Sequence, residues 1–168
     1  MPQVRMQVLS GPASVHPHRM GWSLAPVPVE ALAAAGSAES TPRDAAWRGE
    51  WYAWRLIGTN NHELGRSALS FPTYELALGA FAELQEGLDR LVQVPIYDRP
   101  AGRWGWRLEL DGAAVAISGR WYQRDQDSSL GAAKFVELSA EAELADSVVA
   151  MHERRPLGAL SQPVRGMR

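Results

Sequence analysis

Histidines next to carboxylates are the residues of this chain best suited to acid–base chemistry. His62 directly precedes Glu63, and His152 directly precedes Glu153. Neighbouring residues of a strand point to opposite faces of a sheet, so His62 and Glu63 are not expected to act on one substrate atom. His152 falls in a segment that we expect to be a tail. Neither pair predicts an active site.

Metal and cofactor chemistry also lacks a recognisable motif. His16 and His18 flank a proline without further ligands beside them, and we expect them to lie in a solvated loop. The chain has no cysteine, which excludes disulfides, thiol nucleophiles and thiolate metal sites. It contains no glycine-rich phosphate loop and no nucleophile elbow. We therefore expect no catalytic residue, no cofactor and no metal site.

The segment from Gly119 to Asp127 interleaves aromatic residues with arginines. Such a combination can stack on bases and contact phosphate. It can also bind a protein partner, or it can close the end of a core with a guanidinium lying over a ring. All three interpretations are open at this point. The candidate partner-binding residues are Arg120, Trp121, Tyr122 and Arg124.

Length and charge restrict the class of protein. With 168 residues and 46% hydrophobic residues, the chain can form one domain or two small repeats that share a core. The net charge of −2 gives no bulk attraction to nucleic acid or to an anionic membrane. No apolar run approaches the roughly 20 residues of a membrane span. Residues 33–38 resemble a signal-cleavage site, but two prolines and a glutamate interrupt the preceding stretch. We expect a cytoplasmic protein without a membrane partner.

Two blocks of the sequence match at a separation of 52 residues, which is the distance from Trp54 to Trp106. Residues 51–56 read Trp-Tyr-Ala-Trp-Arg-Leu, and residues 103–108 read Arg-Trp-Gly-Trp-Arg-Leu. Because strand side chains alternate between faces, each block predicts a strand with an aromatic inner face and an arginine on the other face. The tryptophans that we expect to pack in the core are Trp54, Trp104 and Trp106.

A tight turn and a return strand are expected after each block. Asp111-Gly112 favours a hairpin turn, because that turn requires positive φ. Asn60-Asn61 occupies the matching place in the first block and also tolerates positive φ. The return strands are predicted at residues 62–68 and 113–118.

An amphipathic helix is predicted after each hairpin, because apolar residues recur at steps of three and four. Thr73 is the expected N-cap of the first helix. The apolar face of that helix comprises Tyr74, Ala77, Leu78, Phe81, Leu84, Leu88 and Leu91. The expected cap of the second helix is one of Asp127, Ser128 and Ser129. Its predicted stripe comprises Leu130, Ala133, Val136, Ala140 and Leu144, widened by Phe135 and Leu138.

Two further strands complete the pattern. One is predicted at residues 91–97, where Pro95 indicates an edge or a strand end. The other, at residues 4–9, is the expected first strand of the first half. The predicted fold is α+β, with two tandem β-β-β-α repeats that form an antiparallel sheet and pack one helix each on one face. The predicted divisions are an arm or insertion over 1–46, the first repeat over 47–91, the second over 92–150, and a basic flexible tail over 151–168.

The second half resembles one unit of the YegP-like family of small bacterial and archaeal proteins. The resemblance rests on Val94-Pro-Ile-Tyr-Asp, on Gly102-Arg-Trp-Gly-Trp-Arg-Leu and on the Asp-Gly turn that follows. Residues 51–91, with Trp54-Arg55-Leu56 and Asn60-Asn61, resemble the other unit. The resemblance implies tandem strand-strand-strand-helix repeats. The family has no established biochemical activity, so the resemblance implies no site residue.

Three classes of function follow from these observations. We expect a non-enzymatic module for protein interaction or self-association, with a protein partner or a homodimer, because sheet edges must be covered or paired. The first alternative is nucleic-acid binding through residues 119–127 and the basic tail, with Arg55 and Arg107 facing outward. The second alternative is an enzyme of unknown class.

Overall fold

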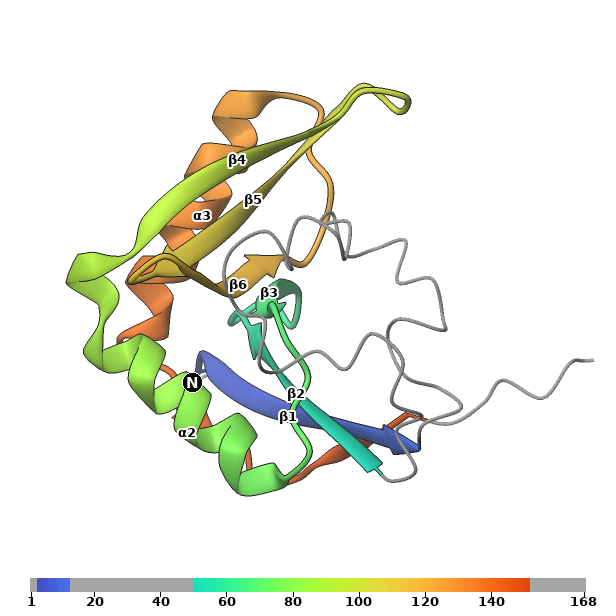
Figure 1. Ribbon diagram of the computed structural model, residues 1–168, viewed down its shortest axis with the longest axis vertical. Helices are drawn as coiled ribbons and strands as arrows, with labels where there is room; N and C mark the ends of the chain where they lie inside the picture. The colour runs from blue at the N-terminus through green and yellow to red at the C-terminus, as the bar shows by residue number, and fades with distance from the viewer. Residues whose placement is uncertain (1–2, 13–49, 152–168) are drawn as a thin grey trace, which may run out of the picture.

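The computed structural model describes residues 3–12 and 50–151, and within them the chain forms an α+β fold with one mixed sheet and two α-helices (Figure 1). Most of the predicted arm and nearly all of the predicted tail, with His16, His18 and His152, lie outside the described residues. The elements in chain order are β1 (Arg5–Pro12), β2 (Glu50–Ile57), β3 (Glu63–Ser67), α2 (Tyr74–Glu86), the 3₁₀ turn η2 (Leu88–Arg90), β4 (Val92–Asp98), β5 (Arg103–Leu110), β6 (Ala113–Ser118), α3 (Asp125–Ser139), β7 (Glu143–Leu144) and β8 (Val149–Ala150).

The six longer strands form one continuous antiparallel sheet. Their order is β4-β5-β6-β3-β2-β1, and the short strands β7 and β8 both pair with β1. The join between the two halves is the antiparallel pair β3–β6, with Gly65 opposite Ser118 and Ser67 opposite Ala116. The two helices lie against the same side of the sheet (Figure 1).

The expectation of a purely antiparallel sheet is wrong at the β1 edge. There β7 and β8 run parallel to β1. The chain leaves α3 and returns along β1, where three amides bond to its carbonyl groups: Glu143 N–H to Val4 (3.2 Å), Ala145 N–H to Met6 (2.8 Å) and Met151 N–H to Ser10 (2.7 Å). The residues after α3 therefore close this edge of the sheet.

The turns adopt the backbone conformations that their residues predicted. Asp111 and Gly112 have φ of 50° and 84°, and Asn61 has φ of 63°. Positive φ is tolerated by glycine and is enriched for asparagine and aspartate, which is why these residues suit the turns. The return strands β3 and β6 fall within the predicted ranges.

The first helix begins as predicted. The Thr73 hydroxyl accepts the amide N–H of Leu76 at 3.2 Å, which satisfies one of the free donors at the helix start. The helix ends at Glu86, so Leu88 and Leu91 lie beyond it. The buried residues of α2 are Ala77, Phe81 and Leu84.

The second helix begins earlier than predicted and buries a different face. Its N-cap is Arg124, not Asp127, Ser128 or Ser129, and the Arg124 side chain makes no capping hydrogen bond. Leu130 is 62% exposed and Leu144 lies outside the helix in β7, so these members of the predicted stripe are wrong, whereas its members Phe135, Val136 and Leu138 do pack in or against the core. Of that stripe, Ala133 and Ala140 are also exposed. The residues that α3 does bury are Ser128, Ala132, Phe135 and Ser139.

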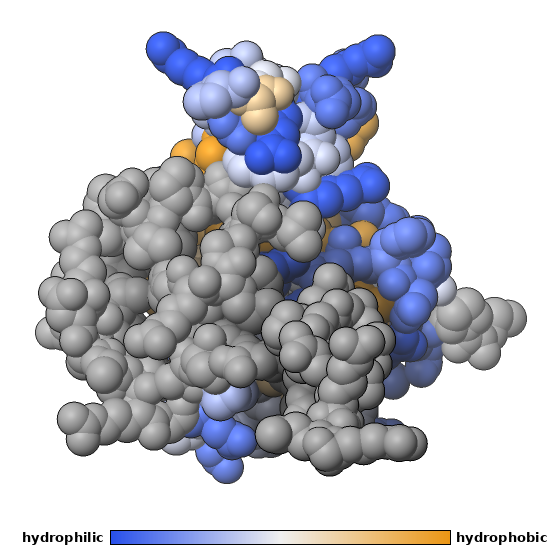
Figure 2. All heavy atoms as spheres, turned by 90° about the vertical axis from the view of Figure 1, so that its right-hand side faces the viewer, coloured by the Kyte–Doolittle hydropathy of each residue, from blue (hydrophilic) through white to orange (hydrophobic). Residues whose placement is uncertain are grey.

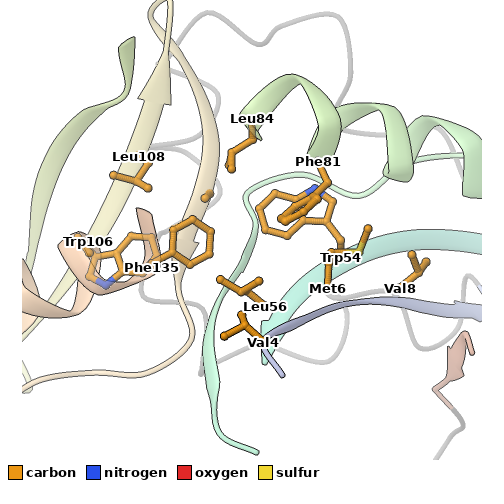
Figure 3. Packing of buried hydrophobic residues seen from close by; sticks show 12 residues of the cluster. Val4, Met6, Val8, Trp54, Leu56, Phe81, Leu84, Trp106, Leu108 and Phe135 are labelled. Carbon is orange, nitrogen blue, oxygen red and sulfur yellow. The ribbon is translucent and has the colours of Figure 1, made fainter. Parts of the chain in front are cut away.

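One hydrophobic core spans both halves of the sheet. Trp54 packs edge-on against Phe81 and Trp106 packs tilted against Phe135, each pair with ring centroids 5.1 Å apart (Figure 3). The same cluster contains further apolar residues from both the sheet and the helices: Val4, Met6, Val8, Leu56, Leu84, Leu108, Ala116 and Ala132. Gly65 lies under this packing, because a Cβ there would stand 2.6 Å from Trp106 and 2.7 Å from Phe135.

The opposite face of the sheet carries a row of long polar side chains. Cross-strand pairing aligns Arg107, Arg66, Arg55 and Gln7 from β5 to β1, with the buried Ile117 of β6 between Arg107 and Arg66. The arginines bond within the sheet: Arg66 to Glu63 (2.5 Å), Arg107 to Glu109 (2.5 Å), and Arg55 to Gln7 (2.7 and 2.9 Å). The arginines predicted to lie on the outer face are therefore there, and their guanidinium groups are bonded to neighbouring side chains of the sheet.

Candidate partner-binding site

Three aromatic residues form a row across the far end of the β4–β5 hairpin. Tyr97 and Trp104 are cross-strand partners with ring centroids 4.5 Å apart. Tyr122 continues the row, because its amide and carbonyl groups exchange two 2.7 Å hydrogen bonds with those of Trp104. Trp104 is half-buried rather than in the core as expected. Trp106, two residues further along β5, is by contrast fully buried against Phe135 of α3.

Two arginines lie over aromatic rings beside this row. The Arg120 guanidinium is 4.8 Å from the ring centroid of Tyr122, and the Arg103 guanidinium is 4.6 Å from that of Trp121. Arg103 is held in turn by the Asp98 carboxylate at 3.0 Å. We call the residues of this region the arginine–aromatic cluster: Tyr97, Arg103, Trp104, Arg120, Trp121 and Tyr122.

The two arginines differ in their remaining binding capacity. Arg103 is about one-third exposed and already neutralised by Asp98. Arg120 is exposed, and within the described residues no carboxylate lies within ion-pair distance of it. Contact with the Tyr122 ring restricts its guanidinium without satisfying its donors. Arg120 is therefore the cation of the cluster that can receive an acidic group.

A glycine of α3 gives Tyr122 its position. A Cβ at Gly131 would lie 2.7 Å from Cζ of Tyr122 and closer still to its hydroxyl oxygen. The helix can approach the Tyr122 ring only because residue 131 has no side chain. The ring that carries Arg120 is thus fixed by the helix backbone on one side and by the Trp104 bridge on another.

The four residues predicted from sequence do not form one contact group. Arg120 and Tyr122 come together, while Trp121 contacts Arg103 instead. Arg124 is exposed at the start of α3, where its carbonyl accepts the amide of Ser128 at 3.2 Å. Sequence reasoning missed Tyr97, Arg103 and Trp104 as surface residues. The sequence signal that could have found them is the short turn between Asp98 and Arg103. A short turn pairs the last residues of β4 with the first residues of β5, and so brings Tyr97 next to Trp104.

The arrangement offers binding groups rather than reactive ones. His62 is exposed, and the Glu63 carboxylate next to it contacts Arg66 at 2.5 Å and Arg55 at 3.7 Å. In the part of the chain that the structure describes, no three histidine, aspartate or glutamate residues form a group able to hold a metal. Figure 2 shows the hairpin end at the top of the molecule, free of the grey residues, with hydrophilic and hydrophobic side chains side by side.

None of the helices in the described ranges combines the length and apolar character needed to cross a membrane.

Comparison with known proteins finds a likeness in fold. No protein-family model matches the chain, and no curated protein matches it. Among solved structures, the chain is similar to the solution NMR structure of the protein of unknown function yegP from E. coli, with 15% sequence identity and a TM-score of 0.44. The match covers 62% of this chain and 85% of that one. This likeness agrees with the YegP-like resemblance of the sequence and transfers no residue role, and the chain is thus similar to a protein whose own function is unknown.

Proposed function

We propose that the chain is a non-enzymatic protein-interaction module whose contact surface is the arginine–aromatic cluster. The observation that carries the proposal is the exposed Arg120, held over Tyr122 beside the exposed ring of Tyr97. Tyrosine, tryptophan and arginine dominate the binding energy of protein interfaces. Here several of them are already fixed in place, so binding would cost little side-chain entropy.

A protein partner fits this surface better than a nucleic acid. Bases bind by stacking on ring faces, and in the cluster Arg103 and Arg120 already lie over the rings of Trp121 and Tyr122. Asp125 and Asp127 in the first turn of α3, just after the cluster in the chain, add negative charge that disfavours a phosphate backbone. We expect a partner that places a carboxylate near Arg120 and an apolar side chain on Tyr97.

The proposal extends to the organisation of the chain. The two β-β-β-α halves would be tandem repeats, divided at residues 47–91 and 92–150, with an arm before them and a basic tail after them. Matched interactions in the two halves support this: the amide of Trp54 donates to the Ser67 hydroxyl, and that of Trp106 donates to the Ser118 hydroxyl, both at 3.2 Å. The module would act in the cytoplasm without a cofactor.

The test is affinity purification of the full chain from its native host, with matched variants. We expect a protein that the wild type and Arg90→Ala both capture and that Arg120→Ala and Tyr97→Ala both lose. Arg90 is a suitable control because it is an exposed arginine beside Asp111, at the other end of β5. Purified partner should bind Arg120→Ala at least about tenfold more weakly.

Two outcomes would contradict the proposal. Capture of the same protein by all variants would place the contact elsewhere. Capture of nucleic acid that is released by moderate salt and lost with Arg120→Ala would favour the nucleic-acid alternative, because phosphate contacts weaken steeply with salt.

A further inference from the structure

The two edges of the sheet differ in how they end. The β1 edge is closed by β7 and β8 through backbone hydrogen bonds from Glu143, Ala145 and Met151. At the other end, β4 pairs with β5 over all seven of its residues, and among the described residues no strand covers its outer side. Figure 1 shows β4 along the border of the sheet, with α3 behind it.

The backbone of β4 directs unused polar groups outward. Trp104, opposite Tyr97, exchanges its hydrogen bonds with Tyr122, and Trp106, opposite Pro95, donates its amide to Ser118. The backbone hydrogen-bonding groups of Trp104 and Trp106 therefore point away from β4. The backbone groups of Tyr97 and Pro95 cannot be bonded to them and point outward from the sheet. By alternation, the outward groups are the amides of Gln93 and Tyr97 and the carbonyls of Gln93, Pro95 and Tyr97.

Most of the side chains along this edge are apolar. Val92 is 58% exposed and Tyr97 is 47% exposed, and Leu130 on α3 is 62% exposed. The helix is tied to the strand near Leu130, because Gln93 donates to the Ser129 hydroxyl at 3.2 Å. The strand has a single ionisable acid, Asp98 at its end, and Arg103 neutralises that group. Natural edge strands usually carry charges that prevent pairing, and β4 does not.

We infer that the open edge of β4 is a self-association surface whose occupant is β4 of a second copy of this chain, paired antiparallel about a two-fold axis. An uncharged edge is complementary to itself, because two copies bring no like charges opposite one another. In the described sheet the opposite edge ends in two strands of two residues each, β7 and β8, so β4 is the one long strand with an unpaired outer side. Pairing through β4 therefore closes the assembly at two copies and does not propagate into a filament.

Pro95 sets the strength of this contact. It has no amide hydrogen, so every register that pairs residue 95 loses one donor from each copy. Proline on an edge strand also discourages indiscriminate pairing. The dimer is therefore expected to be reversible and concentration-dependent. It would place two arginine–aromatic clusters on one extended sheet, although the pairing itself does not depend on the proposed function.

The experiment is sedimentation velocity of the full chain over about a hundredfold range of concentration. The wild type should move from the 18.4 kDa monomer toward twice that mass. Two substitutions at one position sharpen the test. Pro95→Thr restores the outward amide in a residue that favours strands, and should tighten the dimer. Pro95→Asp restores the same amide but opposes two carboxylates, and should raise the dissociation constant about tenfold, less so at high salt.

Controls separate this inference from the proposed function and from misfolding. Leu76→Asp makes an equivalent change at an apolar residue of α2 that is 52% exposed, and should leave the dimer unchanged. Arg120→Ala should lose the partner and keep the dimer. A wild type that stays monomeric at every concentration would overturn the inference. So would a Pro95→Thr protein that melts normally but dimerises no more tightly than the wild type.

Discussion

The first half of the molecule, β1 to α2, and the second half, β4 to α3, have the same inner face and different outer ends. Each half has a buried tryptophan whose amide donates to a serine hydroxyl at 3.2 Å. Each also has a phenylalanine from the helix 5.1 Å from that tryptophan. In the first half, an aromatic bridge joins Tyr52 to Phe71, as Trp104 joins Tyr122 in the second. The shared features are thus the packing of the core and a backbone bridge between half-buried aromatic residues.

The differences concern what each half offers to a partner. In the first half the Tyr52 hydroxyl donates to the Glu50 carboxylate at 2.9 Å, and this bond raises the pKa of Tyr52 above its usual range. In the second half the matching region holds Arg103 and Arg120 over aromatic rings. The first half ends in a closed sheet edge and the second in an open one. Similar packing in the two halves of one core is therefore compatible with different outer ends, one that completes the sheet and one that we propose as a binding surface.

The largest expected effect tests the shared core. Trp54→Ala and Trp106→Ala should each lower the free energy of unfolding by about 3–5 kcal/mol, because each removes a fully buried indole and leaves a cavity. Chemical denaturation of both variants measures this. An unchanged stability in either one would show that the two halves do not contribute equally to the core.

Glycines at matching positions of the two helices should respond in opposite ways. Gly131→Ala should destabilise by about 1–3 kcal/mol, because the new methyl group displaces the Tyr122 ring. A Cβ at Gly79 would meet no neighbouring atom within 4 Å, so Gly79→Ala should stabilise by about 0.5–1 kcal/mol. Thermal melts of the pair provide the measurement, and changes of the same sign would contradict the packing described for α3.

The two helix starts predict a smaller pair of effects. Thr73→Ala should cost about 1 kcal/mol, because it removes the hydroxyl that accepts the Leu76 amide. Arg124 has extended backbone angles that suit a cap but makes no capping bond. Arg124→Ser should therefore stabilise by roughly 0.5–1 kcal/mol. Equal and negligible changes in both variants, measured by urea unfolding, would show that neither cap matters.

The strands and turns could be predicted because each depends on local residue order. Alternation in residues 103–110 and positive-φ residues at 111–112 specify a hairpin without knowledge of the rest of the chain. The face of α3 could not be predicted from apolar periodicity. The helix buries Ser139 and exposes Leu130. Burial of the Ser139 hydroxyl is possible because it donates a hydrogen bond to the carbonyl of Phe135 at 2.8 Å.

The closed edge and the candidate site depend on contacts between distant segments. Each of β7 and β8 has two residues, too few to show alternation, and both form because β1 offers free carbonyl groups. Arg103 lies at the start of β5 and Trp121 in the loop between β6 and α3, so their contact joins separate segments of the chain. Sequence could identify arginines and aromatic residues in 119–127, but it could not show which arginine would meet which ring.

The contrast between the two edges can be measured directly by amide hydrogen exchange of the full chain at low and high concentration. At low concentration the Tyr97 amide should exchange rapidly and the Ala145 amide slowly, since Ala145 donates to Met6 at 2.8 Å. At high concentration Tyr97 should become protected while Ala145 stays unchanged. Exchange at Tyr97 that is slow in the monomer, or that never changes with concentration, would contradict an edge open to a second copy.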